Sequence, residues 1–212
     1  MAHSLSQVLG FAVVTADRRK AAIRSFLFDD RSWAIRYVVV DRGRHAPVHA
    51  VTIPVSRFQS PNWSQASIET ELSLQELVGG ADAEAVLPVS RQRQLAWNRH
   101  FGWGNNDAYP DVFPAAFPRQ EFREAGGEND PHLRSSNDLI SYQVWASGEL
   151  LGSLEDFFVD ESSWHIGYLL VKAGGWTYDE RFVPSSSVTS ISWGQGRVVV
   201  GHAGVPAQPA PQ

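Results

Sequence analysis

Two acidic pairs are the first residues in this sequence whose types could do chemistry: Asp29-Asp30 and Asp160-Glu161. Carboxylates at a turn suit a hard cation such as Ca²⁺ or Mg²⁺, which takes oxygen ligands. Two adjacent carboxylates are too few to enclose an ion. Each pair is also followed by serine, and Asp and Ser hydrogen-bond their own backbone in tight turns. Two interpretations therefore stay open, cation ligands and turn-forming side chains.

The histidines and serines give weaker signals. His45 and His49 have the i, i+4 spacing of a metal-binding pair, but no third ligand is evident. His165 is interpreted as a surface residue. The chain has no cysteine, which excludes disulfides and thiolate metal sites. No Ser-His-Asp arrangement can be proposed from spacing, so we predict no metal, no cofactor and no enzymatic activity.

A run of arginines and aromatic residues is the better candidate for function. Arg and large aromatic side chains are enriched at the hot spots of protein interfaces. We predict the run to be partner-binding, with docking onto the rest of its own chain as the alternative; either way we expect the aromatic side chains to be buried, against the chain or between subunits. Its members are Arg91, Arg93, Trp97, Arg99, Phe101 and Trp103.

An internal duplication must position these groups. Residues 29–43 return as residues 160–174 at a constant offset of 131, with seven of fifteen positions identical. Average composition would give roughly one chance identity. The chain is therefore two copies of one structural unit.

The repeated stretch reads as a β-strand with period 2, because it is rich in β-branched and aromatic residues. One face carries Trp33, Ile35, Tyr37 and Val39, and the second copy keeps this face as Trp164, Ile166, Tyr168 and Leu170. We predict that the retained face is the core. The other face, with Ala34, Arg36, Val38 and Val40, has changed at its start and is predicted to meet solvent or a partner.

Short strands around this stretch predict an all-β protein of two small domains. We place the first domain at 5–80, a connector at 81–138, the second domain at 139–203 and a disordered tail at 204–212. Ser73 and Glu76 predict the start of a short helix by a capping box. Gly194 to Gly196 predicts a hairpin turn.

Charge and hydropathy narrow the location and the partners. The net charge is −5, and only the first 60 residues are basic, so we predict no tight RNA or DNA binding. The N-terminus has no signal peptide pattern, and no apolar run approaches the ~20 residues of a membrane helix. We expect a cytoplasmic protein with at most peripheral membrane contact.

Each copy resembles the PRC-barrel domain, a family named from the cytoplasmic domain of the photosynthetic reaction-centre H subunit. The resemblance rests on a strand motif and on a following "V/I-P-x-S" step. These are Asp29 to Gly43 with Ile53 to Ser56, and Asp160 to Gly174 with Val183 to Ser186. The connector is similar to that of a bacterial tandem subfamily in Pro88 to Gln92, Phe101 to Trp103 and Asp130 to Ser135.

The resemblance implies two small β-barrels in tandem, used as docking modules. We therefore predict a non-enzymatic protein-binding or scaffold module that binds a protein or itself, as a homo-oligomer such as a dimer. Two alternatives remain: an accessory subunit of a photosynthetic or electron-transport membrane complex, and an accessory factor in ribosome or RNA assembly. The H subunit has a membrane helix before its barrel and this chain has none, which weighs against a reaction-centre role.

Overall fold

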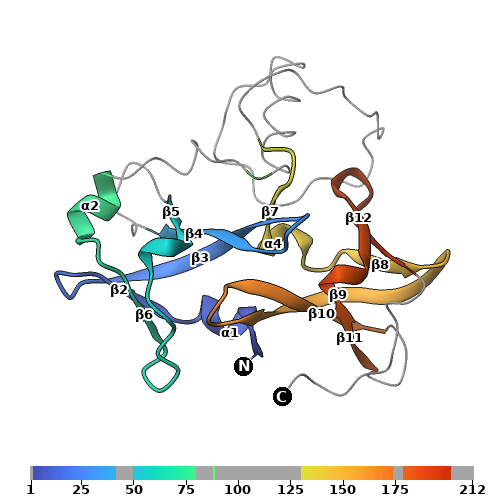
Figure 1. The fold of residues 1–212 in the computed structure, drawn as a ribbon, viewed down its shortest axis with the longest axis horizontal. Helices are drawn as coiled ribbons and strands as arrows, with labels where there is room; N and C mark the ends of the chain where they lie inside the picture. Colours follow the sequence, from blue (N-terminus) through green and yellow to red (C-terminus); the bar gives the residue numbers. More distant parts are fainter. Residues whose placement is uncertain (1, 42–49, 80–87, 89–129, 174–178, 202–212) are drawn as a thin grey trace, which may run out of the picture.

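The computed structural model describes residues 2–41, 50–79, 88, 130–173 and 179–201, and the statements below concern these residues. The predicted all-β class is confirmed: strands dominate and the helices are short. The strands form two sheets that lie side by side, the first on the left and the second on the right of Figure 1. No closed barrel is formed by the described strands.

The first copy contains strands β1 to β6 and the helices between and after them. Their bounds are β1 Ala2–Ser4, α1 Leu5–Leu9, β2 Ala12–Val14, β3 Lys20–Asp29, β4 Ile35–Asp41, β5 Ala50–Pro54, the 3-10 turn η1 Val55–Arg57, β6 Ser67–Glu69 and α2 Leu74–Gly79. The predicted capping box begins α2, because Ser73 N–H donates to Glu76 Oε2 at 2.8 Å and Glu76 N–H donates to Ser73 Oγ at 3.3 Å.

The second copy repeats this order. Its elements are β7 Leu133–Ser135, α4 Ser136–Leu139, β8 Gln143–Ala146, β9 Glu149–Asp160, β10 His165–Lys172, β11 Glu180–Pro184, η3 Ser185–Ser187, β12 Val188–Ser192, η4 Trp193–Gln195 and β13 Arg197–Val200. The predicted hairpin turn is confirmed, with Gly196 at a φ of 55° between β12 and β13. β7 lies inside the segment 81–138 that the sequence assigns to the connector, and α4 crosses the end of that segment.

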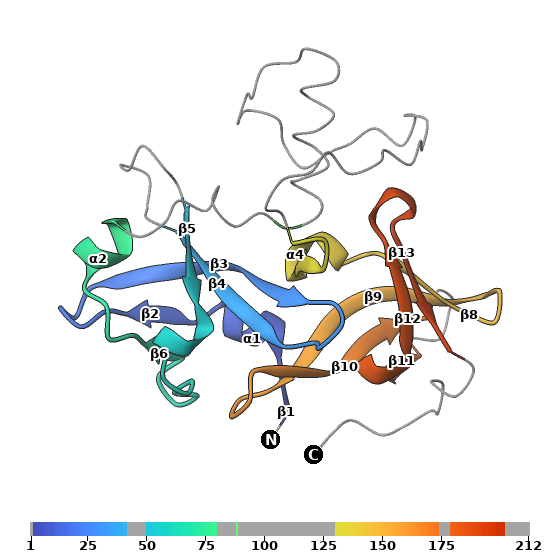
Figure 2. The same cartoon turned by 45° about the horizontal axis from the view of Figure 1, so that its top comes forward.

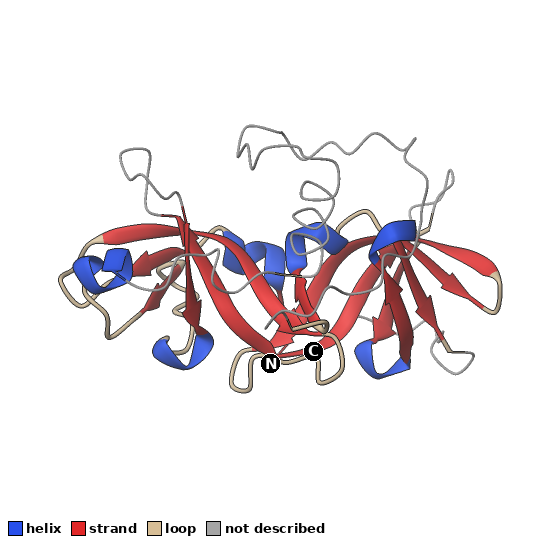
Figure 3. Ribbon diagram, turned by 90° about the horizontal axis from the view of Figure 1, so that it is seen from above, coloured by secondary structure: helices blue, strands red, loops and turns tan. Residues whose placement is uncertain are grey.

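Five strands follow the same order in the two sheets, and the second sheet has one further strand, β12. The six-stranded sheet runs β5-β4-β3-β2-β6, and the seven-stranded sheet runs β11-β10-β9-β8-β13-β12. The pairs β2–β6 and β8–β13 are parallel, and the other pairs are antiparallel. Seen from above in Figure 3, the two sheets fan outward from a shared centre.

The copies exchange their first strands. β1 pairs with β9 of the second sheet, and β7 pairs with β3 of the first. The registers match at the 131 offset, since Ala2 faces Asp160 where Leu133 faces Asp29. In Figure 2, β1 lies below the first sheet against the long strand β9. Each sheet is therefore completed by a strand from the other copy, and the exchange has pseudo-two-fold symmetry.

The short helices that follow the exchanged strands also contact the opposite copy. Asp156 of β9 is buried and accepts hydrogen bonds from Ser6 N–H at 3.1 Å and from Ser6 Oγ–H at 2.7 Å, which satisfies a free donor at the start of α1. In the other copy Ser136 Oγ, at the start of α4, accepts from Phe26 N–H of β3 at 3.2 Å. Both helix starts are thus fixed to the opposite copy.

The two tryptophans of the repeated motif meet at the junction of the two copies. Trp33 and Trp164 have φ values of 57° and 54°, in the left-handed region that L-residues seldom adopt. The Trp33 carbonyl accepts from Ile166 N–H, and the Trp164 carbonyl accepts from Ile35 N–H, both at 2.8 Å. Because each carbonyl bonds the other copy, the unusual backbone is held by the junction itself.

The predicted core face of the repeated strand is correct for its first residues and wrong for its last ones. Trp33 and Ile35 are buried in one continuous core to which both copies contribute. Val38 and Val40, predicted for the opposite face, are also fully buried in that core. In the second copy the same change puts Leu169 into the core.

A β-bulge causes this change of face. Leu27 faces Tyr37 and Phe28 faces Ile35, so Arg36 is an extra residue in β4, and the period-2 alternation reverses after it. Gly167 is the extra residue in β10. Tyr37 and Val39 therefore turn to the outer face, where a smaller buried cluster forms from Leu27, Val39, Ala50 and Leu133, with Tyr37 packed against it.

Gly152 in β9 lies where the backbone of β10 comes closest. A Cβ atom built at Gly152 would stand 2.6 Å from the Lys172 carbonyl carbon and 2.9 Å from Ala173 Cα. The backbone φ of Gly152 is 152°, which L-residues rarely adopt. Backbone atoms cannot give way as a flexible side chain can. We expect Gly152→Ala to lower the free energy of unfolding by about 2 kcal/mol, in the range of overpacking in a core. Urea unfolding checks this against Gly167→Ala, where a Cβ meets no atom within 4 Å; equal losses would contradict the steric cause.

Candidate functional site

The predicted partner-binding residues lie outside the described part of the chain. This holds for Arg91, Arg93, Trp97, Arg99, Phe101 and Trp103, and also for the histidine pair His45 and His49. Their roles stay predictions. The described residues offer three other places to consider: the acidic turns, a small pocket and an outer sheet face.

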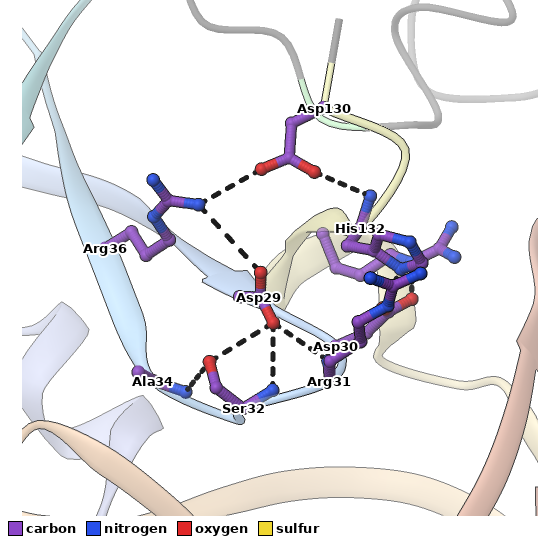
Figure 4. Close-up of polar contacts among 9 residues, drawn as sticks. Asp29, Asp30, Arg31, Ser32, Ala34, Arg36, Asp130 and His132 are labelled. Carbon is purple, nitrogen blue, oxygen red and sulfur yellow. Dashed lines mark hydrogen bonds and ion pairs between the residues drawn. The ribbon is translucent and has the colours of Figure 1, made fainter.

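Asp29 closes the turn between β3 and β4. Its Oδ1 accepts from Arg31 N–H at 2.9 Å and from Ser32 N–H at 2.8 Å (Figure 4). Burial pushes the pKa of Asp29 upward, but the hydrogen bonds from Ser32 and Arg31 outweigh it and hold the pKa below its ordinary value. Asp160 closes the matching turn of the second copy, and hydrogen bonds from Ser162 and then Ser163 lower its pKa. The turn-forming interpretation is confirmed for these two carboxylates.

Asp30 holds the incoming strand β7. Its Oδ2 accepts from Arg134 Nε at 2.6 Å, and its Oδ1 lies 2.8 Å from His132 Nδ1. Its backbone N–H donates to the His132 carbonyl at 2.9 Å. The Arg134 and Asp30 side chains are only 12% and 10% exposed, so this ion pair is largely removed from water. We name Asp30, His132 and Arg134 the β7 clamp.

Arg36, the extra residue of the bulge, extends the clamp on its outer side. Its Nη1 lies 3.1 Å from Asp130 Oδ2 and 3.9 Å from Asp29 Oδ2 (Figure 4). Asp130 Oδ1 in turn accepts from His132 N–H at 2.9 Å. The bulge therefore orients the Arg36 guanidinium toward Asp130, in the segment that leads into β7.

The second copy has a smaller version of the clamp on β1. Glu161, at the position of Asp30, lies 3.4 Å from His3 Nε2 and accepts a hydrogen bond from Trp63 Nε1. The His3 imidazole stacks on the Trp63 indole with ring centroids 3.8 Å apart, and Phe11 meets the indole edge at 5.0 Å. An acidic turn residue thus holds the basic residue of the exchanged strand in both copies.

The partners of the acidic pairs are groups of the turns and of the exchanged strands. The carboxylates bind turn backbone and cationic side chains, and no group of three or more His, Asp or Glu suited to a metal ion occurs among the described residues. The clamp was not predicted from sequence, because β7 lies in the predicted connector. The sequence similarity between β1 and β7 is weak: Ser4 and Ser135 match at the 131 offset, and few of their neighbours match.

A small pocket lies where β7, α4, β12 and η4 meet. It is lined by Arg134, Ser135, Asp138, Leu139, Tyr142, Ile191 and Trp193. Burial raises the pKa of the Tyr142 hydroxyl to about 12, with a further rise from Asp138. Tyr142 and Trp193 correspond to Phe11 and Trp63, whose rings pack together at the same place in the first copy. Both copies therefore place aromatic side chains at this corner, with Tyr in the second copy where the first has Phe.

The outer face of the second sheet carries an apolar patch. The Arg197 guanidinium carbon stands 4.2 Å from the centre of the Trp145 ring, a cation–π contact. Leu150, which faces Trp145 across β8 and β9, is 52% exposed. Val199 faces Trp145 on the other side. We name Trp145, Leu150, Arg197 and Val199 the outer patch.

The first sheet is polar at most of the corresponding positions. Lys20 faces Val14 as Leu150 faces Trp145. Arg197 corresponds to Ser67, and Val199 corresponds to Glu69, which pairs with Arg18 at 3.6 Å. Only Val14, at the position of Trp145, is apolar. Comparing the faces of the two copies could have found the outer patch from sequence, had the bulges been known.

Comparison with known proteins adds no relatives to this description. No family model and no curated protein matches the chain. Within the described ranges, no helix has both the length and the apolar character to span a bilayer.

Acid should weaken the fold through the turn carboxylates. Because the pKa values of Asp29 and Asp160 are lowered in the folded state, their contribution is fully present above the unfolded-state value near pH ~3.9. It is lost as the pH falls through the lower folded-state values. We expect urea midpoints to drop below about pH 4, with a flatter pH dependence in the Asp29→Asn, Asp160→Asn double variant. Identical pH slopes for both proteins would contradict this role.

Proposed function

We propose that the protein is a non-enzymatic protein-binding or scaffold module built from two PRC-type repeats. The paired motifs at the 131 offset and the shared sheet order support a repeat of one unit. The described acidic side chains at the junction favour binding over catalysis, since Asp29, Asp30 and Asp156 hold turns and exchanged strands.

The outer patch is the observation that carries the proposal. Exposed apolar patches rimmed by polar residues often mark protein interaction sites. Trp and Arg are the residue types that dominate interface hot spots, and here they stack on each other beside the exposed Leu150. The polar first sheet is an internal control: the same fold does not require an apolar surface at this place.

Site-specific photo-crosslinking in the native host tests the binding role. A photoreactive residue at Leu150 should give discrete adducts of higher mass, and the same residue at Lys20, the matching position on the polar sheet, should not. Adding Trp145→Ala should remove the adducts from the position 150 protein, while its circular dichroism stays unchanged. Adducts of equal yield at both positions, or none at either, would reject the outer patch as a binding surface.

A further inference from the structure

The exchanged strands show what kind of partner the junction accepts. Each sheet is completed by a short strand of the other copy, through backbone pairing and one acidic clamp. Such pairing needs an open strand edge and a matching strand. It does not need the two to belong to one chain.

The chain between the copies is long. Residues 80–129 separate α2 from the segment that leads into β7, a stretch of 50 residues. Fully extended, 50 residues reach up to ~165 Å, far more than one molecule requires. Chain length therefore does not tie β7 to the β3 edge of its own chain.

We propose that the two copies also pair between two molecules of this protein, with β7 of one molecule on the β3 edge of the other. The second molecule returns the exchange, so a closed dimer contains two complete junctions, each with the contacts of the single chain. This is domain swapping, and the pseudo-two-fold junction makes it possible without any new interface. The occupant of each strand edge is then a second copy of this chain.

Concentration decides between the two forms. A tether gives the partner strand an effective concentration of roughly millimolar for a short linker, and less for a longer one. At micromolar protein the single-chain form should therefore dominate. Weakening the pairing within one chain should shift the balance toward exchange, and the β7 clamp offers a way to do so.

Two charge-reversed variants of the full-length chain make the test. Asp30→Arg places two cations in the clamp, and Arg134→Asp places two carboxylates there, so each variant opposes pairing within its own chain. A mixed dimer of the two variants removes both conflicts. One of its junctions carries the native pair of charges, and the other carries the reversed pair.

The variants are unfolded together in urea, refolded at equal concentration and compared with each variant refolded alone. We expect the mixture to give a species of twice the 23.5 kDa chain mass by light scattering. It should contain both variants and unfold at a higher urea concentration than either alone. Only single-chain species with the two separate transitions would overturn the proposal. If neither variant folds alone, recovery of a folded mixed dimer supports it and failure of the mixture to fold overturns it.

The double variant Asp30→Arg, Arg134→Asp is the matched control. Both reversals lie in one chain, so the clamp can form within it, and we expect a single-chain species that regains most of the lost stability. If the double variant also fails to fold, Asp30→Asn and Arg134→Gln give a milder pair for the same exchange, because each variant leaves one charge of the clamp unpaired in its own chain and the mixed dimer restores the native pair at one junction. The outer patch is intact in all these proteins, so this inference and the proposed binding role can fail independently.

Discussion

Trp33→Ala and Trp164→Ala should each lower the free energy of unfolding by about 3–5 kcal/mol, the usual loss for a buried large aromatic side chain. The two side chains are 4% and 8% exposed. Trp33 stacks on Phe28 at 5.4 Å, and Trp164 meets Phe26 of the other copy at 6.1 Å. Either truncation therefore leaves a cavity at the junction of the copies. Urea unfolding followed by circular dichroism measures the loss.

Trp145→Ala is the control for this pair. Its ring lies on the outer face against Arg197, so truncation leaves no cavity in the core. We expect a loss under about 1 kcal/mol, as for most surface substitutions. Comparable losses for all three tryptophans would mean that burial at the junction does not set the cost.

Asp30→Ala should cost about 3 kcal/mol, because it leaves the Arg134 guanidinium largely buried without its carboxylate. Glu161→Ala, the matching change in the other copy, should cost about 1 kcal/mol. The difference follows from exposure: the His3 and Glu161 side chains are 21% and 32% exposed, so water can replace the lost partner. The two variants are compared by urea unfolding at pH 7.

The Asp30→Ala loss should also appear as local opening of β7. Hydrogen exchange at Leu133 to Ser135 should become faster, while exchange in β1 stays slow. Fast exchange in both strands would show that Asp30 supports the whole junction rather than β7. A loss no larger than that of Glu161→Ala would contradict the burial argument.

The sequence predicts the local structure here better than the way the copies join. The repeated motif fixes the strand pair and its turn, because Asp29, Ser32 and Trp33 act on neighbours a few residues away. The bulge at Arg36 was not predictable, since one extra residue in a strand leaves no mark in composition yet reverses every later side chain. Val38 and Val40 were assigned to the wrong face for this reason.

The exchange of β1 and β7 between the copies also could not be predicted from the sequence. Three-residue strands carry too little periodicity to be recognised, and β7 pairs with a strand more than a hundred positions before it. The clamp residues His132 and Arg134 become meaningful only once β7 is placed beside Asp30. Predicting the outer patch would likewise have required knowing which side chains face outward.

The exchanged strands also set an order of events during synthesis of the chain. Ala2 pairs with Asp160, so the first strand made must wait until the 160th residue has left the ribosome. At 5–20 residues per second this delay is about 8–30 s. Until residue 135 has emerged, the β3 edge of the first sheet also lacks its strand β7, and unpaired edges invite association with other chains. The newborn protein is therefore most exposed to aggregation, and most in need of chaperones, in the interval before its second copy emerges.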